Sequence, residues 1–263
     1  MRLVAYQGLI LDFGGVVTTD FHGALAAFCV REGLAPDAVS RALGALPEGR
    51  EVFAAAEAGR VPQRELERML ARQLGVRGED LIGRMLGGLR PRPETADLAK
   101  RARAAGVATA VLSNSWGPGG YDPYAGYDLA GLFDVVVISD QVGLRKPEPA
   151  IYDLTASKLG LRPEDCVFVD DTPANLVTAR QLGMAAVHFT GAPADFAEIE
   201  RLIGIARSHG GSWAGNRWLR RGWPASGGRH LLSKSASRCP CTGGVEAIQP
   251  SGSTGRARCG EPR

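Results

Sequence analysis

An unbroken apolar run that leads into an acid and two glycines, residues 8–17 (GLILDFGGVV), constrains the fold of this chain more than any other stretch. A short apolar run bounded by turn residues is typical of a strand that is buried on both faces. Asp12 would follow this strand at its carboxyl end, where open α/β sheets bind their ligands. Gly14 and Gly15 would let the backbone turn tightly there. The stretch therefore predicts the first strand of a parallel sheet, with an acid at its functional edge.

The remainder of the first 207 residues divides into an all-helical part and an alternating part. Apolar periodicity predicts helices over 21–31, 36–46, 51–58, 61–74 and 81–89, with a turn at 47–49. Beyond these, predicted strands at 107–112, 134–139, 166–169 and 185–189 alternate with predicted helices at 94–105, 149–159, 173–182 and 193–206. This alternation predicts a Rossmann-like α/β core, a parallel sheet with helices on both faces. We expect this core to comprise residues 1–18 and 92–207, with an all-α insert over 19–91.

The composition changes after residue 207. Residues 208–263 hold eleven Gly, eight Ser and four Pro, and nine Lys or Arg against two Glu, whereas residues 1–207 carry 22 basic and 26 acidic side chains. A segment so poor in apolar residues cannot offset the entropy of ordering, so we expect a disordered basic tail. Its tryptophans among arginines, or its cysteines with His230, would bind nucleic acid or a metal only if the tail were ordered. The mildly acidic body indicates no nucleic-acid partner.

The sequence carries no signal for a membrane or for secretion. No apolar run approaches the roughly 18 residues that a spanning helix needs, and residues 1–7 do not resemble a signal peptide. Five cysteines, an odd number, do not form a disulfide framework. We expect a soluble cytoplasmic protein without membrane association, as a monomer or a homodimer.

Polar side chains follow three of the later predicted strands, as Asp12 follows the first. Carboxyl ends of parallel strands lie along one edge of the sheet, so we expect these side chains to converge with Asp12. They are Ser113 and Asn114 after the second strand, Lys146 after the third, and Asp170 and Asp171 after the fourth.

Together these groups suit phosphoryl transfer assisted by Mg²⁺. Asp12 and one of the pair Asp170 and Asp171 supply hard oxygen ligands, which Mg²⁺ combines with water and phosphate oxygens. The hydroxyl and the amide that follow the second strand can donate hydrogen bonds to a phosphate, and Lys146 adds a compact positive charge. A carboxylate held in this setting can attack phosphorus in line and form an aspartyl-phosphate.

Four motifs carry a resemblance to the haloacid dehalogenase superfamily, and the resemblance covers about residues 8–205. The motifs are DFGGV from Asp12, LSN from Leu112, RKPEPAIY from Arg145 and VDDTPAN from Val169. The helical insert resembles the family's C1 cap in position and character. Among subgroups the chain is similar to bacterial sugar-1-phosphate phosphatases and to the N-terminal phosphatase domain of soluble epoxide hydrolases. The resemblance implies a Mg²⁺-dependent phosphatase that acts on a small phosphorylated metabolite, a sugar phosphate being one candidate.

The resemblance also implies a role for each motif residue. Asp12 is the implied nucleophile. The implied ligands of Mg²⁺ are Asp12, the carbonyl of Gly14, and Asp171. The remaining implied roles are phosphate binding for Ser113 and Asn114, orientation and charge neutralisation for Lys146, and support of catalysis for Asp170.

One position departs from the pattern of the family's phosphatases. They carry a second Asp, a general acid and base, two residues after the nucleophile, where this chain has Gly14. Asp20 or bound water is a candidate for that proton transfer, or the leaving group departs without help. Two other functions stay open. A 2-haloacid dehalogenase also lacks the second Asp, but its fourth motif lacks the acid pair of Asp170 and Asp171; a catalytically weak phospho-ligand-binding protein is the other.

A stretch dense in Gly, Pro and aromatic residues, 115–127, follows the second motif. It predicts a loop beside the pocket and under the helical insert. Its rings would pack either on a substrate or against the body of the protein.

Overall fold

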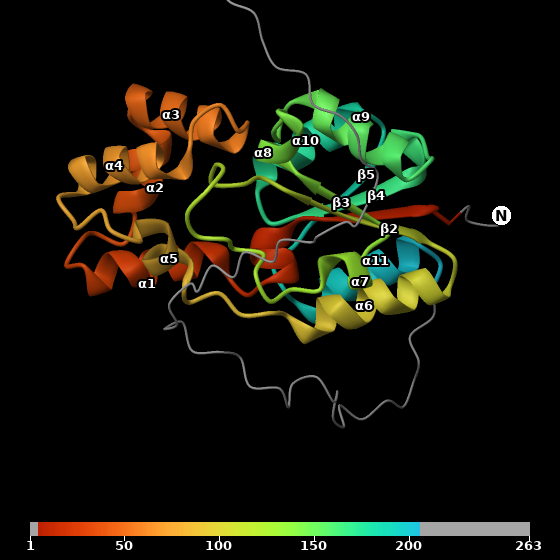
Figure 1. Ribbon diagram of the computed structural model, residues 1–263. Coiled ribbons are helices and arrows are strands. Elements are labelled where there is room, and N and C mark those ends of the chain that lie inside the picture. Colours follow the sequence, from red (N-terminus) through yellow and green to blue (C-terminus); the bar gives the residue numbers. More distant parts are fainter. Residues whose placement is uncertain (1–4, 206–263) are drawn as a thin grey trace, which may run out of the picture. The chain divides into compact units, whose positions relative to one another are not determined.

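The computed structural model describes residues 5–205, in which five strands form a parallel sheet (Figure 1). β1 pairs with β2 on one side and with β4 on the other, so the apolar run at residues 8–11 is the central strand, and it is buried throughout. The strands are β1 (Gly8–Leu11), β2 (Ala108–Ser113), β3 (Val135–Ile138), β4 (Cys166–Asp170) and β5 (Ala185–His188), in the order β3-β2-β1-β4-β5.

Helices cover both faces of this sheet because successive side chains of a strand point to opposite faces. Leu9 and Leu11 pack in a cluster with one set of helices, and Ile10 packs in a second cluster with another set (Figure 1). The first set is α6 (Pro93–Ala104), α7 (Leu129–Leu132) and α11 (Pro193–Leu202), and the second is α9 (Pro149–Lys158) and α10 (Pro173–Gln181). The predicted parallel α/β sheet with helices on both faces is confirmed.

Five helices inserted between β1 and α6 share a hydrophobic core of their own, and we call them the helical layer. Both ends of the insert lie together, because Thr18 and Pro91 form an antiparallel bridge. The helices are α1 (Phe21–Arg31), α2 (Ala38–Gly44), α3 (Pro47–Glu57), α4 (Gln63–Leu74) and α5 (Leu81–Leu86). The boundaries of a separate cap domain at residues 18/19 and 91/92 stay a prediction.

Several local assignments differ from the sequence prediction. Residues 47–49 are not a turn but the first turn of α3, where Pro47 is tolerated because the N–H that it lacks would have no helical partner there. The structure also contains α8 (Ser139–Val142) and a 3₁₀ turn at Pro163–Asp165. Elements of three or four residues, α7 included, are too short to produce a detectable apolar period.

The predicted tail at 208–263 lies outside the described residues. Within residues 5–205, Cys29 and Cys166 are buried free thiols. None of the helices described there is long and apolar enough to cross a membrane.

The contact between α2 and α3 depends on Gly49. A Cβ at this position would lie 1.7 Å from the carbonyl oxygen of Ala42, and a backbone atom cannot move away as a flexible side chain can. We expect Gly49→Ala to lower the free energy of unfolding by about 1–3 kcal/mol, measured by urea denaturation. Gly44→Ala is the matched control, since its Cβ meets no atom within 4 Å; equal destabilisation by both variants would contradict the steric explanation.

Candidate active site

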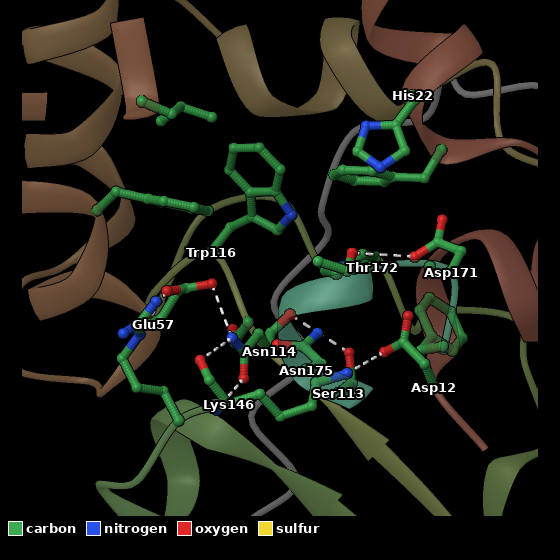
Figure 2. A pocket seen from close by; sticks show the side chains of 18 of the residues that line it. Asp12, His22, Glu57, Ser113, Asn114, Trp116, Lys146, Asp171, Thr172 and Asn175 are labelled. Carbon is green, nitrogen blue, oxygen red and sulfur yellow. Dashed lines mark hydrogen bonds and ion pairs between the residues drawn. The ribbon is translucent and has the colours of Figure 1, made fainter. Parts of the chain in front are cut away.

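The order of the strands brings three of the predicted residues together. β1 lies between β2 and β4, so Asp12, Ser113 and Asp170 stand at the carboxyl ends of three adjacent strands. A cavity of about 400 Å³ opens at this edge and lies between the sheet and the helical layer. Six of the predicted site residues line it: Gly14, and the five labelled in Figure 2, which are Asp12, Ser113, Asn114, Lys146 and Asp171.

The turn after β1 places Asp12 and Gly14 in this cavity. Gly15 has a φ of 82°, a left-handed conformation that glycine adopts readily. Its N–H donates a 3.0 Å hydrogen bond to Oγ1 of Thr18, and the hydroxyl of Thr95 donates to the carbonyl of Val16 at 2.8 Å. The turn is therefore held by buried hydrogen bonds to residues on both sides of the insert.

A buried lysine joins two of the acids. Nζ of Lys146 donates to Oδ1 of Asp12 at 2.5 Å and to Oδ2 of Asp170 at 2.7 Å, and the lysine side chain is 2% exposed. Burial alone would lower the pKa of Lys146, but the two carboxylates outweigh it and hold that pKa above its usual value. The ammonium group therefore stays charged, as two close carboxylates require.

Burial raises the pKa of Asp12 to about 8, and repulsion from Asp170 and Asp171 adds to this rise, while Lys146 opposes it. Burial, followed by repulsion from Asp170, also raises the pKa of Asp171. Both raised values are caused mainly by burial, and repulsion among the three acids is the smaller contribution.

The three acids fit a divalent cation. One carboxylate oxygen from each of Asp12, Asp170 and Asp171 lies within 4.8 Å of the others. Against the ammonium of Lys146 they leave a formal charge of −2. Asp170 is fully buried and accepts from Lys146, from the N–H of Thr172 and from Nδ2 of Asn175, so its oxygens already have donors. Asp12 and Asp171 line the cavity, which leaves these two as the carboxylates suited to a hard cation such as Mg²⁺.

Ser113, the last residue of β2, and Asn114, the next residue, both form hydrogen bonds with other segments of the site. Oγ of Ser113 accepts a 2.9 Å hydrogen bond from the hydroxyl of Tyr124. Nδ2 of Asn114 donates to Oε1 of Glu57 at 2.9 Å and to the carbonyl of Lys146 at 3.0 Å, and its Oδ1 accepts from the N–H of Lys146 at 2.9 Å. The Asn114 side chain thus fixes the Lys146 loop, and its amide hydrogens are engaged before any phosphate arrives.

Glu57 is a site residue that the sequence did not indicate. It lies at the end of α3, is 5% exposed, and accepts from Asn114 and, at 2.6 Å, from Nε of Arg145. Burial raises its pKa, although Arg145 opposes the rise. The available signal was an acid at the end of a run of three alanines (residues 54–56), a charge on a face that otherwise reads as apolar.

The candidate for the missing acid, Asp20, lies elsewhere. Its carboxylate caps α1 by accepting from the N–H of Gly23 at 2.9 Å, and it is exposed and is not among the residues that line the cavity. His22, two residues on, does line the cavity, and its charge acts on Asp171 (Figure 2). The side chain that borders the cavity here is therefore the imidazole of His22 and not the carboxylate of Asp20.

The aromatic loop at 115–127 borders the cavity and also packs against the body of the protein, whereas packing of its rings on a substrate stays a prediction. Trp116 is 5% exposed, lines the cavity and contacts the rings of Phe21 and Phe53 at centroid distances of 6.0 and 5.2 Å. Tyr124, which also lines the cavity, and Tyr127 pack on Phe13 at 4.8 and 4.9 Å. Trp116 and Tyr124 therefore border the space for a ligand, and Tyr124 and Tyr127 close the loop against the core.

The chain belongs to the haloacid dehalogenase-like hydrolases, whose family model matches residues 6–183. This confirms the resemblance that the four motifs carried and identifies the protein as a hydrolase of that family. It is 26% identical over 151 residues to the sesquiterpene phosphatase astK of Aspergillus oryzae, a match covering 56% of this chain and 77% of that protein. It is 34% identical over 103 residues to bifunctional epoxide hydrolase 2 of Mus musculus, covering 38% of this chain but 19% of that protein.

Solved structures share the fold. The HAD family enzyme bt-2542 of Bacteroides thetaiotaomicron, in a magnesium complex, matches with a TM-score of 0.54 at 18% identity, over 72% of this chain and 96% of that one. A dehalogenase with an intermediate complex matches with a TM-score of 0.56 at 19% identity, over 77% of this chain and 99% of that one. At such identities the likeness establishes the fold and leaves the reaction open.

Gly15 is placed so that only glycine leaves room for Asp171. A Cβ there would lie 2.0 Å from Oδ2 of Asp171, and its φ of 82° would strain an alanine as well. We expect Mg²⁺ to raise the melting temperature of the parent chain, and we expect Gly15→Ala to cost about 1–3 kcal/mol of stability and to abolish that rise. Thermal melts with and without Mg²⁺ measure both.

Gly14→Ala is the control for that variant. Gly14 has a φ of −71°, and its Cβ would meet Phe21 at 3.4 Å, an ordinary contact. We expect it to fold like the parent chain. An unaltered response of Gly15→Ala to Mg²⁺ would contradict the placement of the cation beside Asp171.

Proposed function

We propose that this protein is a Mg²⁺-dependent phosphatase that hydrolyses a small phosphate monoester through an aspartyl-phosphate at Asp12. The observation that carries the proposal is the buried arrangement of Asp12, Lys146 and Asp170, with Asp171 beside them on the cavity wall. It pairs a carboxylate nucleophile with a fixed positive charge and with ligands for a cation, which are the parts that phosphoryl transfer needs. The similarity to astK, a sesquiterpene phosphatase, supports the same class of reaction.

The proposed reaction has two steps. An oxygen of Asp12 attacks phosphorus in line, the bond from phosphorus to the ester oxygen breaks, and the departing alkoxide takes up a proton. Water then attacks the aspartyl-phosphate, which releases inorganic phosphate and restores Asp12. Mg²⁺, held by Asp12, the carbonyl of Gly14 and Asp171, would supply positive charge to the phosphate oxygens.

The protein's own residues perform the positioning. Lys146 holds the nucleophile's carboxylate in place and offsets charge on the transferred group, and Asp170 holds Lys146 through its hydrogen bond. Ser113, the last residue of β2, lines the cavity and would face the phosphate. The side-chain amide of Asn114 positions the Lys146 loop in this scheme.

A 2-haloacid dehalogenase is the second candidate, favoured by Gly14 and by the dehalogenase of similar fold. The acid pair at residues 170 and 171 argues against it, because a halide-displacing site gains nothing from extra negative charge near its nucleophile. Turnover of p-nitrophenyl phosphate that needs Mg²⁺ and is lost with a chelator distinguishes the phosphatase from both a dehalogenase and a binding protein.

Asp12→Asn tests the nucleophile. The amide has nearly the same shape but does not attack phosphorus, so kcat should fall by roughly 10⁴-fold or more while the circular dichroism spectrum stays that of the parent. Asp20→Asn, the same substitution in an exposed N-cap, is the control, because Asn caps a helix as well as Asp does. Activity near the parent level in Asp12→Asn would remove the proposed mechanism.

Gly14 leaves the alkoxide without an adjacent acid, so the rate should depend steeply on leaving-group basicity. Each pKa unit that is not offset costs up to about 1.4 kcal/mol, or tenfold in rate. The measurement is log kcat/KM for a series of aryl and alkyl phosphates of graded leaving-group pKa. We expect Gly14→Asp, whose Cβ would make only an ordinary contact with Phe21, to reduce the slope. A flat slope in the parent would show that another residue donates the proton, and His22→Gln would then be the first variant to examine.

A further inference from the structure

The cavity has two chemically different ends. The acids and Lys146 form one end at the sheet edge, and the helical layer with Trp116 forms the other. We call that second end the apolar chamber, and it is lined by Phe21, Leu25, Leu43, Phe53, Leu86 and Trp116. Figure 2 shows the indole of Trp116 on the far side of Asn114 and Ser113 from Lys146. A phosphate bound at the acidic end would thus direct its organic group into the apolar chamber.

The chamber supplies few partners for polar groups. Of the described cavity-lining residues that belong to α1–α5, the polar ones are His22, Ser40 and Glu57. Glu57 is already bound to Asn114 and Arg145. His22 lies toward Asp171, at the acidic end. Among the described residues, Ser40 is then the one polar side chain of α1–α5 that lines the chamber and is not already assigned, so most hydroxyl or ionic groups of a sugar or a charged amino-acid side chain would lose hydrogen bonds here, which opposes binding.

The walls of the chamber are well packed. Trp116 is 5% exposed and is held between the rings of Phe21 and Phe53. Leu25, Leu43 and Leu86 belong to the core cluster of the helical layer and are buried to at least nine-tenths. An apolar group that binds against this pre-formed wall is stabilised because its surface and that of the wall are removed from water.

We propose that the substrate is the phosphate monoester of an apolar alcohol, aliphatic or aromatic, rather than a sugar phosphate. This inference rests on the proposed phosphatase function and specifies the organic group that the site accepts. The 400 Å³ cavity is within the range for small ligands, about 300–1,000 Å³. The apolar chamber is the part of it that discriminates between substrates.

The test is a chain-length series at constant leaving-group chemistry. Ethyl, butyl and hexyl phosphate share nearly the same leaving-group pKa, so differences in kcat/KM report burial of the chain. Each added methylene should raise kcat/KM about fourfold until the chamber is filled. Glucose 6-phosphate, also the ester of a primary alcohol, should be at least tenfold poorer than hexyl phosphate.

Leu89→Gln tests the apolar chamber by substitution, and Leu46→Gln is its control. Leu89 lines the cavity beside the apolar chamber and is half-buried, so the longer polar side chain can be accommodated. It should lower kcat/KM for hexyl phosphate about tenfold and leave ethyl phosphate within twofold of the parent. Leu46→Gln, at a site 47% exposed and outside the cavity lining, should change neither.

The outcomes separate this inference from the function on which it rests. No turnover of any ester with Mg²⁺ present, p-nitrophenyl phosphate included, would overturn the proposed phosphatase and the inference together. Turnover with a flat chain-length series, or with glucose 6-phosphate equal to hexyl phosphate, would overturn the apolar substrate alone.

Discussion

The ammonium of Lys146, buried between the carboxylates of Asp12 and Asp170, is the interaction on which the site depends. A lysine that is 2% exposed is stable only with close partners, and two carboxylates are stable at that distance only with a cation between them. Asp170 is the last residue of β4, and the other two groups come from the loops after β1 and β3, so the site exists only when the sheet has assembled in the order observed. The negative charge of the acid cluster that Lys146 does not balance is the charge that the proposed divalent cation would offset.

Glu57 connects this site to the helical layer. Its carboxylate binds Asn114 and Arg145, and its carbonyl accepts from the hydroxyl of Ser139, so one residue of α3 contacts the loops after both β2 and β3. The helical layer therefore contributes more than apolar walls. It also orients the Asn114 amide, which binds the Lys146 loop, so the geometry of the acidic end depends on the position of α3.

Much of the acidic end was predictable, because an acid or hydroxyl at the end of a buried parallel strand must lie at the carboxyl edge of the sheet. Asp12, Ser113 and Asp171 were expected on that basis, and Lys146 was expected from its place just before a helix that begins with proline; all four line the cavity. The predictions that differ from the structure have physical causes. The role of Asp20 was inferred from nearness in sequence, but its side chain is taken up by the first turn of α1.

The sequence by itself determined the sheet, the ends of its strands and the family, because those signals are local: an apolar run, a turn, and a polar residue at its end. Only the tertiary structure decided what surrounds them. The apolar residues of α1–α5 follow the same helical period whether they face the core of the layer or the cavity, so no pattern in the sequence distinguishes Leu66, which is core, from Leu43, which also lines the cavity. Glu57 and Asn114 are likewise 57 residues apart in the chain, and only the packing of α3 on the sheet edge brings their side chains within hydrogen-bonding distance.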